Sequence, residues 1–231
     1  MIAVTEPLPR TVREAFDSRL ANACDDLALD IAPDRQACLL TYLEQLERWN
    51  ATYNLTAIRE PSQQLVLHLF DCLAVVKPLA RWLPPGGQLV DVGSGGGLPG
   101  VVMAVCRPDV SVHCIDSVGK KAAFVRQLRG VLRLDNLHPH HHRLTTAADH
   151  ATAFAADVVI SRAFATLADF VSLSRSLLGP TGVWAAMKAQ RPEAELSELQ
   201  TREPGVTVDS LIPLQVPELE AERCLIVMRP N

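Results

Sequence analysis

The stretch that most restricts the fold of this chain is QLVDVGSGGGLPG, residues 88–100, which carries four glycines within five positions. Residues 89–92 are typical of a short buried strand, and an apolar run follows Pro99, so the stretch predicts a strand, a tight turn and a helix. Glycine permits positive φ angles and close approach of the backbone to a ligand. The N-terminus of the helix adds unpaired N–H groups. We therefore expect a nucleotide-like cofactor at the carboxyl edge of a parallel sheet.

Composition restricts the class of protein further. The chain has 231 residues, of which 48% are hydrophobic, enough for one sizeable core. It has no apolar run of about 18 residues and no secretory signal, so neither a membrane span nor export is expected. Six cysteines without a CxxC pair are typical of free thiols in a reducing compartment, and we expect a cytoplasmic protein. A net charge of −4 means that any contact with RNA needs a local basic patch.

The periodicity of apolar residues predicts helices first and then an alternation of strands and helices. After a loose leader at residues 1–12, helices are expected over residues 14–29, 35–50, 62–76, 120–132, 167–178 and 192–200. Strands are expected over residues 89–92, 110–115, 137–143, 157–161, 182–187, 206–214 and 223–228. This order predicts a doubly wound, mostly parallel α/β sheet of seven strands with a reversed last strand. We divide the chain into a leader with a helical extension, residues 1–80, and a main domain, residues 81–231, which together form one compact unit.

Two classes of cofactor are compatible with the glycine run. Gly95, Gly97 and Gly100 satisfy GxGxxG, the dinucleotide-binding fingerprint. Asp91 before the run gives DxGxGxG, which resembles the first motif of the Rossmann-like S-adenosylmethionine methyltransferases. Asp116 ends the next strand, where a carboxylate accepts hydrogen bonds from ribose hydroxyls in either class. A turn that only allows close packing, with Asp116 as a helix cap, is the structural alternative.

With these residues in place, the chain resembles the bacterial ribosomal RNA small subunit methyltransferase G family, also called glucose-inhibited division protein B. The resemblance covers residues 48–228, most of the chain. Its landmarks in order are RWNATYNLTAIRE, HLFD, LVDVGSGGGLPG, RPD, DSVGKK, VISRAFA and LQVPELEAER. Seven segments in register are far more specific than one loop.

The resemblance implies a Rossmann-like class I methyltransferase that uses S-adenosyl-L-methionine to methylate N7 of one guanosine in the 530 loop of 16S rRNA. The expected partner is 16S rRNA or the 30S subunit, and the expected state is a monomer. Together with the residues above, the resemblance implies cofactor contacts from Gly93, Gly95, Gly97, Leu98, Asp116, Leu144, Thr145 and Arg162. Leu144 and Thr145 are expected beside the adenine. Residues 143–146 depart from the family because they lack an acidic residue, and the loop at 147–156 is long and rich in alanine.

The expected chemistry needs alignment more than it needs a catalytic base. Guanine N7 has an in-plane lone pair, so no catalytic dyad is required. A methyltransferase of exocyclic amines has an Asn/Asp-Pro-Pro-aromatic motif after the fourth strand, where this chain has SRAF, and a pyrimidine C5 methyltransferase needs a nucleophilic cysteine there. Arg162 is the one candidate for a catalytic role, as a clamp for the methionine carboxylate or a phosphate. Its structural alternative is an ion pair with Asp169 or Asp157, and Phe164 stacks on a base or belongs to the core.

Basic residues after the glycine run are the candidates for RNA docking. The candidates are Lys120, Lys121, Arg126, Arg129, Arg133 and Lys188. The first five are expected on one helix, and the spacing of the three arginines places them on one face. A solvated helix face is the alternative. A second candidate surface, which is equally compatible with a turn network, consists of Asn50, Tyr53, Asn54 and Thr56.

Four histidines, His138, His140, His141 and His142, stand close together on an expected strand. Alternation along a strand puts His141 on the face opposite to its neighbours, and the chemistry needs no metal, so no metal site is expected. Protonation-sensitive surface histidines are the simpler interpretation.

Two other functions stay open at this point. One is a non-catalytic ribosome-assembly factor that binds rRNA and keeps the cofactor fold. The other is an NAD-dependent oxidoreductase, which would need a proton donor that we do not find after the later strands. Binding of the cofactor separates the enzyme from the assembly factor.

Overall fold

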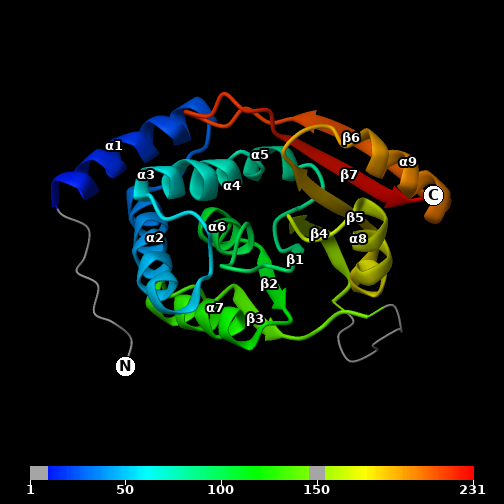
Figure 1. The fold of residues 1–231 in the computed structure, drawn as a ribbon, viewed down its shortest axis with the longest axis horizontal. Helices are drawn as coiled ribbons and strands as arrows, with labels where there is room; N and C mark the ends of the chain where they lie inside the picture. Colours follow the sequence, from blue (N-terminus) through cyan, green and yellow to red (C-terminus); the bar gives the residue numbers. More distant parts are fainter. Residues whose placement is uncertain (1–9, 146–153) are drawn as a thin grey trace.

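The computed structural model describes residues 10–145 and 154–231 of the chain. Its strands form one sheet in the order β3-β2-β1-β4-β5-β7-β6 (Figure 1). The strands are β1 (Gln88–Val92), β2 (Ser111–Asp116), β3 (Leu137–His141), β4 (Ala156–Arg162), β5 (Leu178–Lys188), β6 (Val206–Pro213) and β7 (Cys224–Pro230). Strands β1 to β5 pair in parallel, whereas β7 runs antiparallel to β5 and β6. The predicted mostly parallel α/β sheet with a reversed last strand is confirmed.

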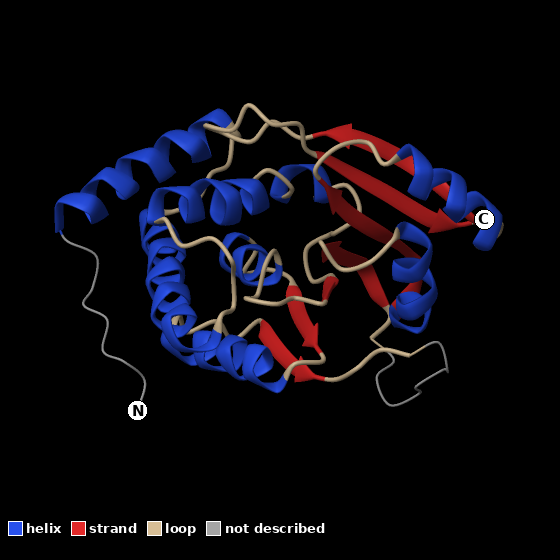
Figure 2. Cartoon of the chain, in the orientation of Figure 1, coloured by secondary structure: helices blue, strands red, loops and turns tan. Residues whose placement is uncertain are grey.

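Helices cover both faces of the sheet (Figure 2). They are α1 (Arg10–Asp26), α2 (Pro33–Tyr53), α3 (Pro61–Gln64), η1 (Leu65–Phe70), α4 (Asp71–Leu73), α5 (Val76–Leu79), α6 (Gly100–Cys106), α7 (Gly119–Val131), α8 (Leu167–Ser174), η3 (Arg175–Leu177) and α9 (Glu193–Arg202). Side chains of α2, α6 and α7 share one buried cluster, and those of α8 and α9 belong to a second cluster. No helix among the described residues is both long and apolar enough to cross a membrane.

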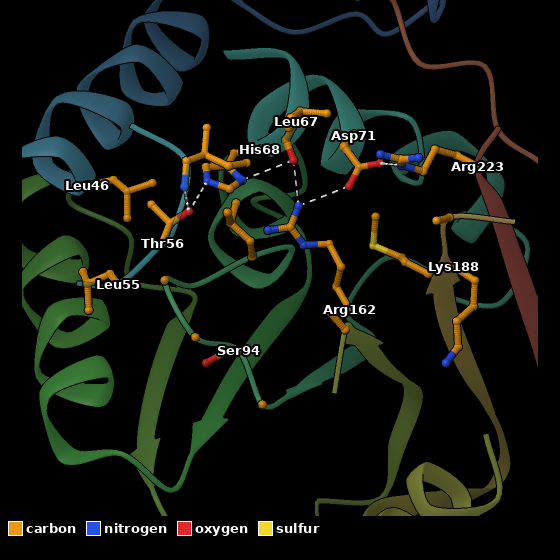
Figure 3. Close-up of a pocket in the computed structure, with 18 of the residues that line it drawn as sticks. Leu46, Leu55, Thr56, Leu67, His68, Asp71, Ser94, Arg162, Lys188 and Arg223 are labelled. Carbon is orange, nitrogen blue, oxygen red and sulfur yellow. Dashed lines mark hydrogen bonds and ion pairs between the residues drawn. The ribbon is translucent and has the colours of Figure 1, made fainter. Parts of the chain in front are cut away.

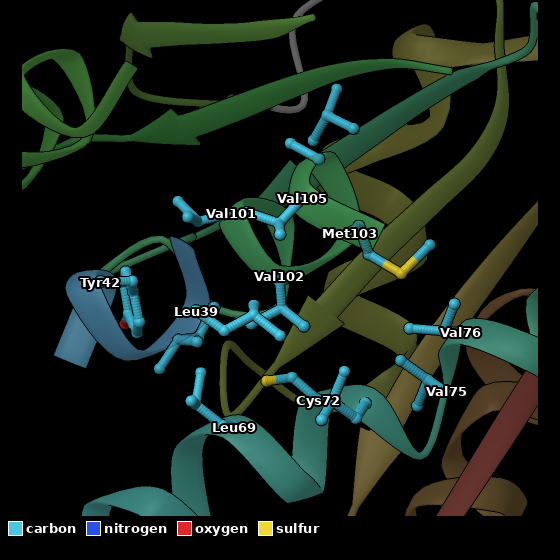
Figure 4. Packing of buried hydrophobic residues seen from close by; sticks show 14 of the residues in the cluster. Leu39, Tyr42, Leu69, Cys72, Val75, Val76, Val101, Val102, Met103 and Val105 are labelled. Atoms are coloured by element: carbon cyan, nitrogen blue, oxygen red, sulfur yellow. The ribbon is translucent and has the colours of Figure 1, made fainter. Parts of the chain in front are cut away.

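The helical extension packs directly on the glycine turn and its helix. Leu39 and Tyr42 of α2 lie against the valines of α6, and the segment around Cys72 closes the same cluster from another side (Figure 4). All three of these side chains are fully buried. The Tyr42 hydroxyl donates a hydrogen bond of 2.9 Å to the carbonyl of Gly96 in the turn. The extension therefore positions the turn as well as covering the sheet.

The single helix expected over residues 62–76 is wrong in detail. The segment changes from α-helix to π-helix over Leu65–Phe70 and back again. The amide of Asp71 donates to the carbonyls of Val66 and His68 and bypasses that of Leu67. A carbonyl released in this way can accept from another element, which is why such turns are frequent at functional sites. Here it accepts from Arg162 at 2.9 Å.

Element boundaries differ from the expected ones mainly where tertiary contacts decide them. The helix α1 begins at Arg10, within the expected leader, and the rest of that leader lies outside the described residues, as does most of the loop at 147–156. The helix expected over residues 167–178 ends at Ser174, because β5 begins at Leu178. The early start of β5 rests on close pairing with β4, where a Cβ on Gly182 would lie 2.3 Å from a backbone oxygen of β4.

Candidate functional site

The glycine turn connects β1 to α6 in the predicted order of strand, turn and helix. Gly93, Gly95 and Gly97 have φ angles of 68°, 57° and 84°, which side chains with a Cβ rarely adopt. Asp91 is fully buried in β1, and its Oδ2 accepts from the amide of Gly100 at 2.8 Å. Asp91 thereby holds the first turn of α6. Burial raises the pKa of Asp91 to about 7, although the Gly100 amide acts in the opposite direction.

Asp116 at the end of β2 connects the turn to the next helix. One carboxylate oxygen accepts from the amide of Gly95 at 2.9 Å, and the other accepts from the amide of Val118 at 2.8 Å. The side chain is buried, with 6% of its residue surface exposed. The helix-cap alternative is wrong, because the N-cap residue of α7 is Val118 and no side chain caps this helix. One oxygen of Asp116 fixes the amide of Val118, and the other holds the glycine turn.

Two cavities meet at the carboxyl ends of β1, β2 and β4 and form one cleft. The first cavity has a volume of about 530 Å³, and the second has about 390 Å³. They share Gly93, Lys121 and Ala163 in their linings. Strand β1 pairs with β2 on one side and with β4 on the other, so the cleft lies at the topological switch point of the sheet.

A carboxylate in the first cavity joins two arginines from distant parts of the chain (Figure 3). Asp71 Oδ2 accepts from Arg162 Nη1 at 3.1 Å, and Asp71 Oδ1 accepts from Arg223 Nε at 3.1 Å. The ion pairs considered for Arg162 are therefore wrong. Asp169 pairs with Arg202, and Asp157 accepts from the amide of Gln88.

A neutral histidine continues this network toward α2 (Figure 3). His68 Nδ1 lies 3.2 Å from the carbonyl of Leu67, so Nδ1 is the donor and Nε2 accepts from the Thr56 hydroxyl at 3.0 Å. Burial, together with the nearby charge of Arg162, lowers the pKa of His68 to about 4. Asn50 Oδ1 accepts from the amide of Thr56 at 2.9 Å, which makes this segment a turn network that shapes the wall of the cavity.

Most of the expected cofactor residues line the cleft. Leu98 lines the first cavity, and Asp116 and Leu144 line the second. Thr145 is exposed and is not among the described lining residues, so its contact with the adenine stays a prediction. Phe164 also lines the second cavity and makes an edge contact with Phe170 at 6.4 Å between ring centroids.

The basic residues fall into two groups. Lys120, Arg126 and Arg129 are exposed on α7, while Lys121 lies at the cleft. Arg133 lies beyond the end of α7 with a φ of 52°, so the prediction that three arginines share one helix face is wrong. The helix α7 ends at Val131 with Leu132 as its C-cap, so the chain has left the helix before it reaches Arg133.

Lys188 lies at the end of β5 in the first cavity. Its Nζ donates to the carbonyl of Ala165 at 3.1 Å and to Glu195 at 2.7 Å. The expectation of a lysine that faces RNA stays untested, but the side chain is fixed within the protein.

The histidine cluster is half-buried and includes a member that the sequence did not single out. His113 of β2 stacks on His138 at 4.8 Å and bonds to His140 through ring nitrogens 3.1 Å apart. His141 faces the other side and bonds to the carbonyl of Ser117. No group of side chains suited to a metal ion occurs among the described residues. Burial, with the neighbouring histidines, lowers the pKa of His113 to about 4.

We expect His113 to contribute stability to the fold that is lost as the pH falls from about 6.5 toward 4. The unfolded chain takes up a proton at His113 near pH 6.5, whereas the folded chain does so only near pH 4. The contribution of neutral His113 to the free energy of unfolding is complete above pH 6.5. After allowance for solvent screening, it amounts to about 1 kcal/mol. Urea unfolding at pH 7.5 and pH 4.5 measures the difference in the free energy of unfolding between the two pH values. His113→Phe should reduce the difference, His141→Asn should not, and equal pH dependence in all three proteins would contradict the assignment.

The sheet order, the glycine turn held from β2 and the cleft at the switch point define a Rossmann-like α/β protein with a cleft for a nucleotide-like cofactor. The solved structures agree in fold. An S-adenosylmethionine-dependent methyltransferase from Aquifex aeolicus superposes with a TM-score of 0.56 at 15% identity, covering 81% of this chain and 97% of that one. A ribosomal protein L11 methylase from Lactobacillus delbrueckii superposes with a TM-score of 0.53 at 14% identity, covering 70% and 78%.

The family follows from sequence comparison. The model of the family described as rRNA small subunit methyltransferase G, or GidB, matches residues 35–227. Two proteins named ribosomal RNA small subunit methyltransferase G are similar over nearly their whole length. The one from Bordetella avium is 50% identical over 93% of this chain and 94% of its own, and the one from Acidovorax is 46% identical over 94% and 96%. The chain belongs to the rRNA small subunit methyltransferase G family, so the expected resemblance is confirmed.

Gly93→Ala is expected to weaken binding of the cofactor about tenfold. A Cβ at this position would lie 2.3 Å from Cδ2 of Phe164, and the residue has a φ of 68°. The left-handed conformation costs a residue with a Cβ about 1–2 kcal/mol, which corresponds to roughly a factor of ten. Titration calorimetry with S-adenosylhomocysteine measures the change. Gly130→Ala is the matched control, because its Cβ would meet nothing within 4 Å, and an equal Kd in both variants would contradict the expectation.

Proposed function

We propose that this protein transfers a methyl group from S-adenosyl-L-methionine to N7 of one guanosine in the 530 loop of 16S rRNA. The observation that carries the proposal is one cleft that joins a glycine turn, held by Asp116, to a cavity lined by Arg162 and Asp71. Membership of the family supports the same substrate. An rRNA substrate implies action in the cytoplasm, and the protein is proposed to act as a monomer.

The second cavity and the glycine turn are compatible with the cofactor. Gly93 and Gly95 line the cleft and let the backbone come close to the cofactor, whereas Gly97 lines neither cavity and packs against Val101. Asp116 keeps carboxylate lone pairs for the ribose hydroxyls besides those used by two amides. Leu144 supplies apolar surface for the adenine. The remaining proposed contacts are Leu98, Thr145 and Arg162. When bound, S-adenosyl-L-methionine supplies the electrophilic methyl group of its sulfonium.

Arg162 is proposed to bind an anion. Both of its described contacts use Nη1, so the guanidinium keeps N–H groups for the cofactor carboxylate or an RNA phosphate. A hydrogen-bond donor at guanine N7 would block the lone pair that attacks the methyl group. Arg162 is therefore not proposed to donate to N7 itself. Methyl transfer moves positive charge onto the purine. Asp71 offsets one of the two positive charges of Arg162 and Arg223 in the cavity that is proposed to receive this base.

The first cavity supports N7 chemistry over methylation of pyrimidine C5. Reaction at C5 requires a thiolate nucleophile. Cys224 is the one cysteine among the described lining residues. Burial, with the charge of Glu222, raises the pKa of Cys224, so this thiol stays protonated near neutral pH. A lone pair on guanine N7 needs only to be held in line with the methyl group.

The exposed basic side chains of α7 are proposed to contact phosphates of the RNA. Lys120, Arg126 and Arg129 are exposed on this helix, Arg133 is exposed just beyond it, and Lys121 lies at the cleft. The net charge of −4 makes such a local patch necessary for binding RNA. Each phosphate contact increases the salt dependence of binding.

The test is transfer of a tritiated methyl group to 30S subunits from a strain that lacks the modification, followed by nucleoside analysis. Label in N7-methylguanosine supports the proposal. Label in another nucleoside overturns the assignment of the acceptor. Binding of neither S-adenosylmethionine nor its product would leave the rRNA-binding assembly factor as the better explanation.

A further inference from the structure

The loop at residues 163–166, between β4 and α8, forms the boundary between the two cavities. Ala163 lines both of them, and Phe164 lines the second. The Phe164 ring lies so close to Gly93 that a Cβ on that glycine would be 2.3 Å from Cδ2 of the ring. The loop therefore lies against the glycine turn at the place where the two cavities meet.

The conformation of the loop needs support from its surroundings. Ala163 has a φ of 53°, in the left-handed region that residues with a Cβ seldom adopt. Residues 163–166 belong to neither a helix nor a strand. Such a backbone persists only where neighbouring structure holds it, and such sites gather at functional clefts.

One ion pair holds the far end of the loop from two other elements. Lys188, at the end of β5, donates to the carbonyl of Ala165 at 3.1 Å and to Glu195 Oε2 at 2.7 Å. Glu195, in the first turn of α9, accepts with the same oxygen from the amide of Leu167 at 2.9 Å. The pair thus fixes a carbonyl and an amide on either side of Thr166. Figure 3 shows the Lys188 side chain extending away from the contact between Arg162 and Asp71.

We propose that Lys188 and Glu195 are positioning residues for methyl transfer, because they hold residues 163–166 between the cofactor and the acceptor base. The proposal rests on the proposed cofactor site in this cleft. The two partly buried side chains, 18% and 28% exposed, touch backbone atoms of the loop and act through it. Removing either one releases the same segment.

The experiment compares Glu195→Ala, Lys188→Met and the double variant with Glu198→Ala. Glu198 is on the same helix and pairs with Arg202. Glu198→Ala is therefore a matched control that also loses an ion pair of α9. Three quantities are measured: amide hydrogen exchange of a peptide over residues 161–168, the Kd for S-adenosylhomocysteine, and kcat with KM on 30S subunits. We expect faster exchange, a Kd raised about fivefold and kcat lowered about tenfold, with KM for the subunit nearly unchanged. The effects of the two single variants should not add fully in the double variant, because each of them already loses the shared ion pair.

Lys188→Arg, which can keep both hydrogen bonds, should recover most of kcat. Exchange and kinetics equal to those of Glu198→Ala would overturn the proposal. So would a Lys188→Met variant that raises only KM for the subunit, since Lys188 would then be a contact to RNA. If the wild-type protein methylates no guanosine N7 but exchange and Kd still change as expected, the acceptor is wrong and the positioning role stands.

Discussion

Asp116→Ala is expected to raise the Kd for S-adenosylmethionine about 100-fold. The substitution removes hydrogen bonds from the carboxylate to the amides of Gly95 and Val118, so it releases both the glycine turn and the start of α7. A hydrogen bond to a charged group contributes about 1.5–3 kcal/mol, and a 100-fold change in Kd corresponds to about 2.8 kcal/mol. Titration calorimetry measures the Kd directly.

Two further variants make this expectation specific. Asp116→Asn keeps one acceptor oxygen and should give an intermediate Kd. Asp135→Ala removes an exposed aspartate beyond α7 and should leave the Kd unchanged. If the folded Asp116→Ala protein binds the cofactor as tightly as the wild type, the cofactor does not lie beside this carboxylate.

Asp71→Ala is expected to lower kcat about 100-fold and to destabilise the fold by about 2 kcal/mol. Asp71 has 8% of its side chain exposed and pairs with both Arg162 and Arg223. Losing one partner of a buried pair costs about 3–5 kcal/mol, and the partial exposure of the arginines reduces that cost. The activity falls further because Arg162 loses its orientation, and misplacement by about 1 Å can cost a factor of 100.

Urea unfolding and methyl transfer to 30S subunits separate these two effects. Asp71→Asn should retain much of the stability because an amide oxygen still accepts from an arginine. Asp109→Ala breaks a more exposed ion pair with Arg107 and should cost less than about 1 kcal/mol without loss of activity. Equal activity of Asp71→Ala and Asp109→Ala would show that Arg162 needs no carboxylate for its role.

The sheet and the cofactor half of the cleft were predictable because their signals are local. The residues that form the glycine turn are consecutive in the sequence. Asp116 ends a strand whose apolar pattern is short and clear. Parallel strands bring their carboxyl ends to one edge, so the order of elements was enough to place Asp116 beside the turn.

The other half of the cleft was not predictable, because its partners are far apart in the sequence. Asp71 lies 91 residues from Arg162 and 152 residues from Arg223, and no local pattern specifies either contact. The π-helical turn that frees the Leu67 carbonyl also has no sequence signal of its own. The HLFD segment marked His68 and Asp71 as landmarks of the family, but only the fold connects them to Arg162.

Cleavage mapping of the modified RNA is the most direct test of the proposed reaction. N7-methylation makes a guanosine sensitive to borohydride and aniline, so strand scission reports both the atom and the position. Subunits from a strain without the modification, treated with this protein and S-adenosylmethionine near the wild-type Kd, should be cleaved at one guanosine in the 530 loop. Treatment with the Asp116→Ala variant at the same cofactor concentration should leave most of them intact. Incorporated methyl groups without cleavage in that loop would contradict the assignment of guanosine N7 as the acceptor.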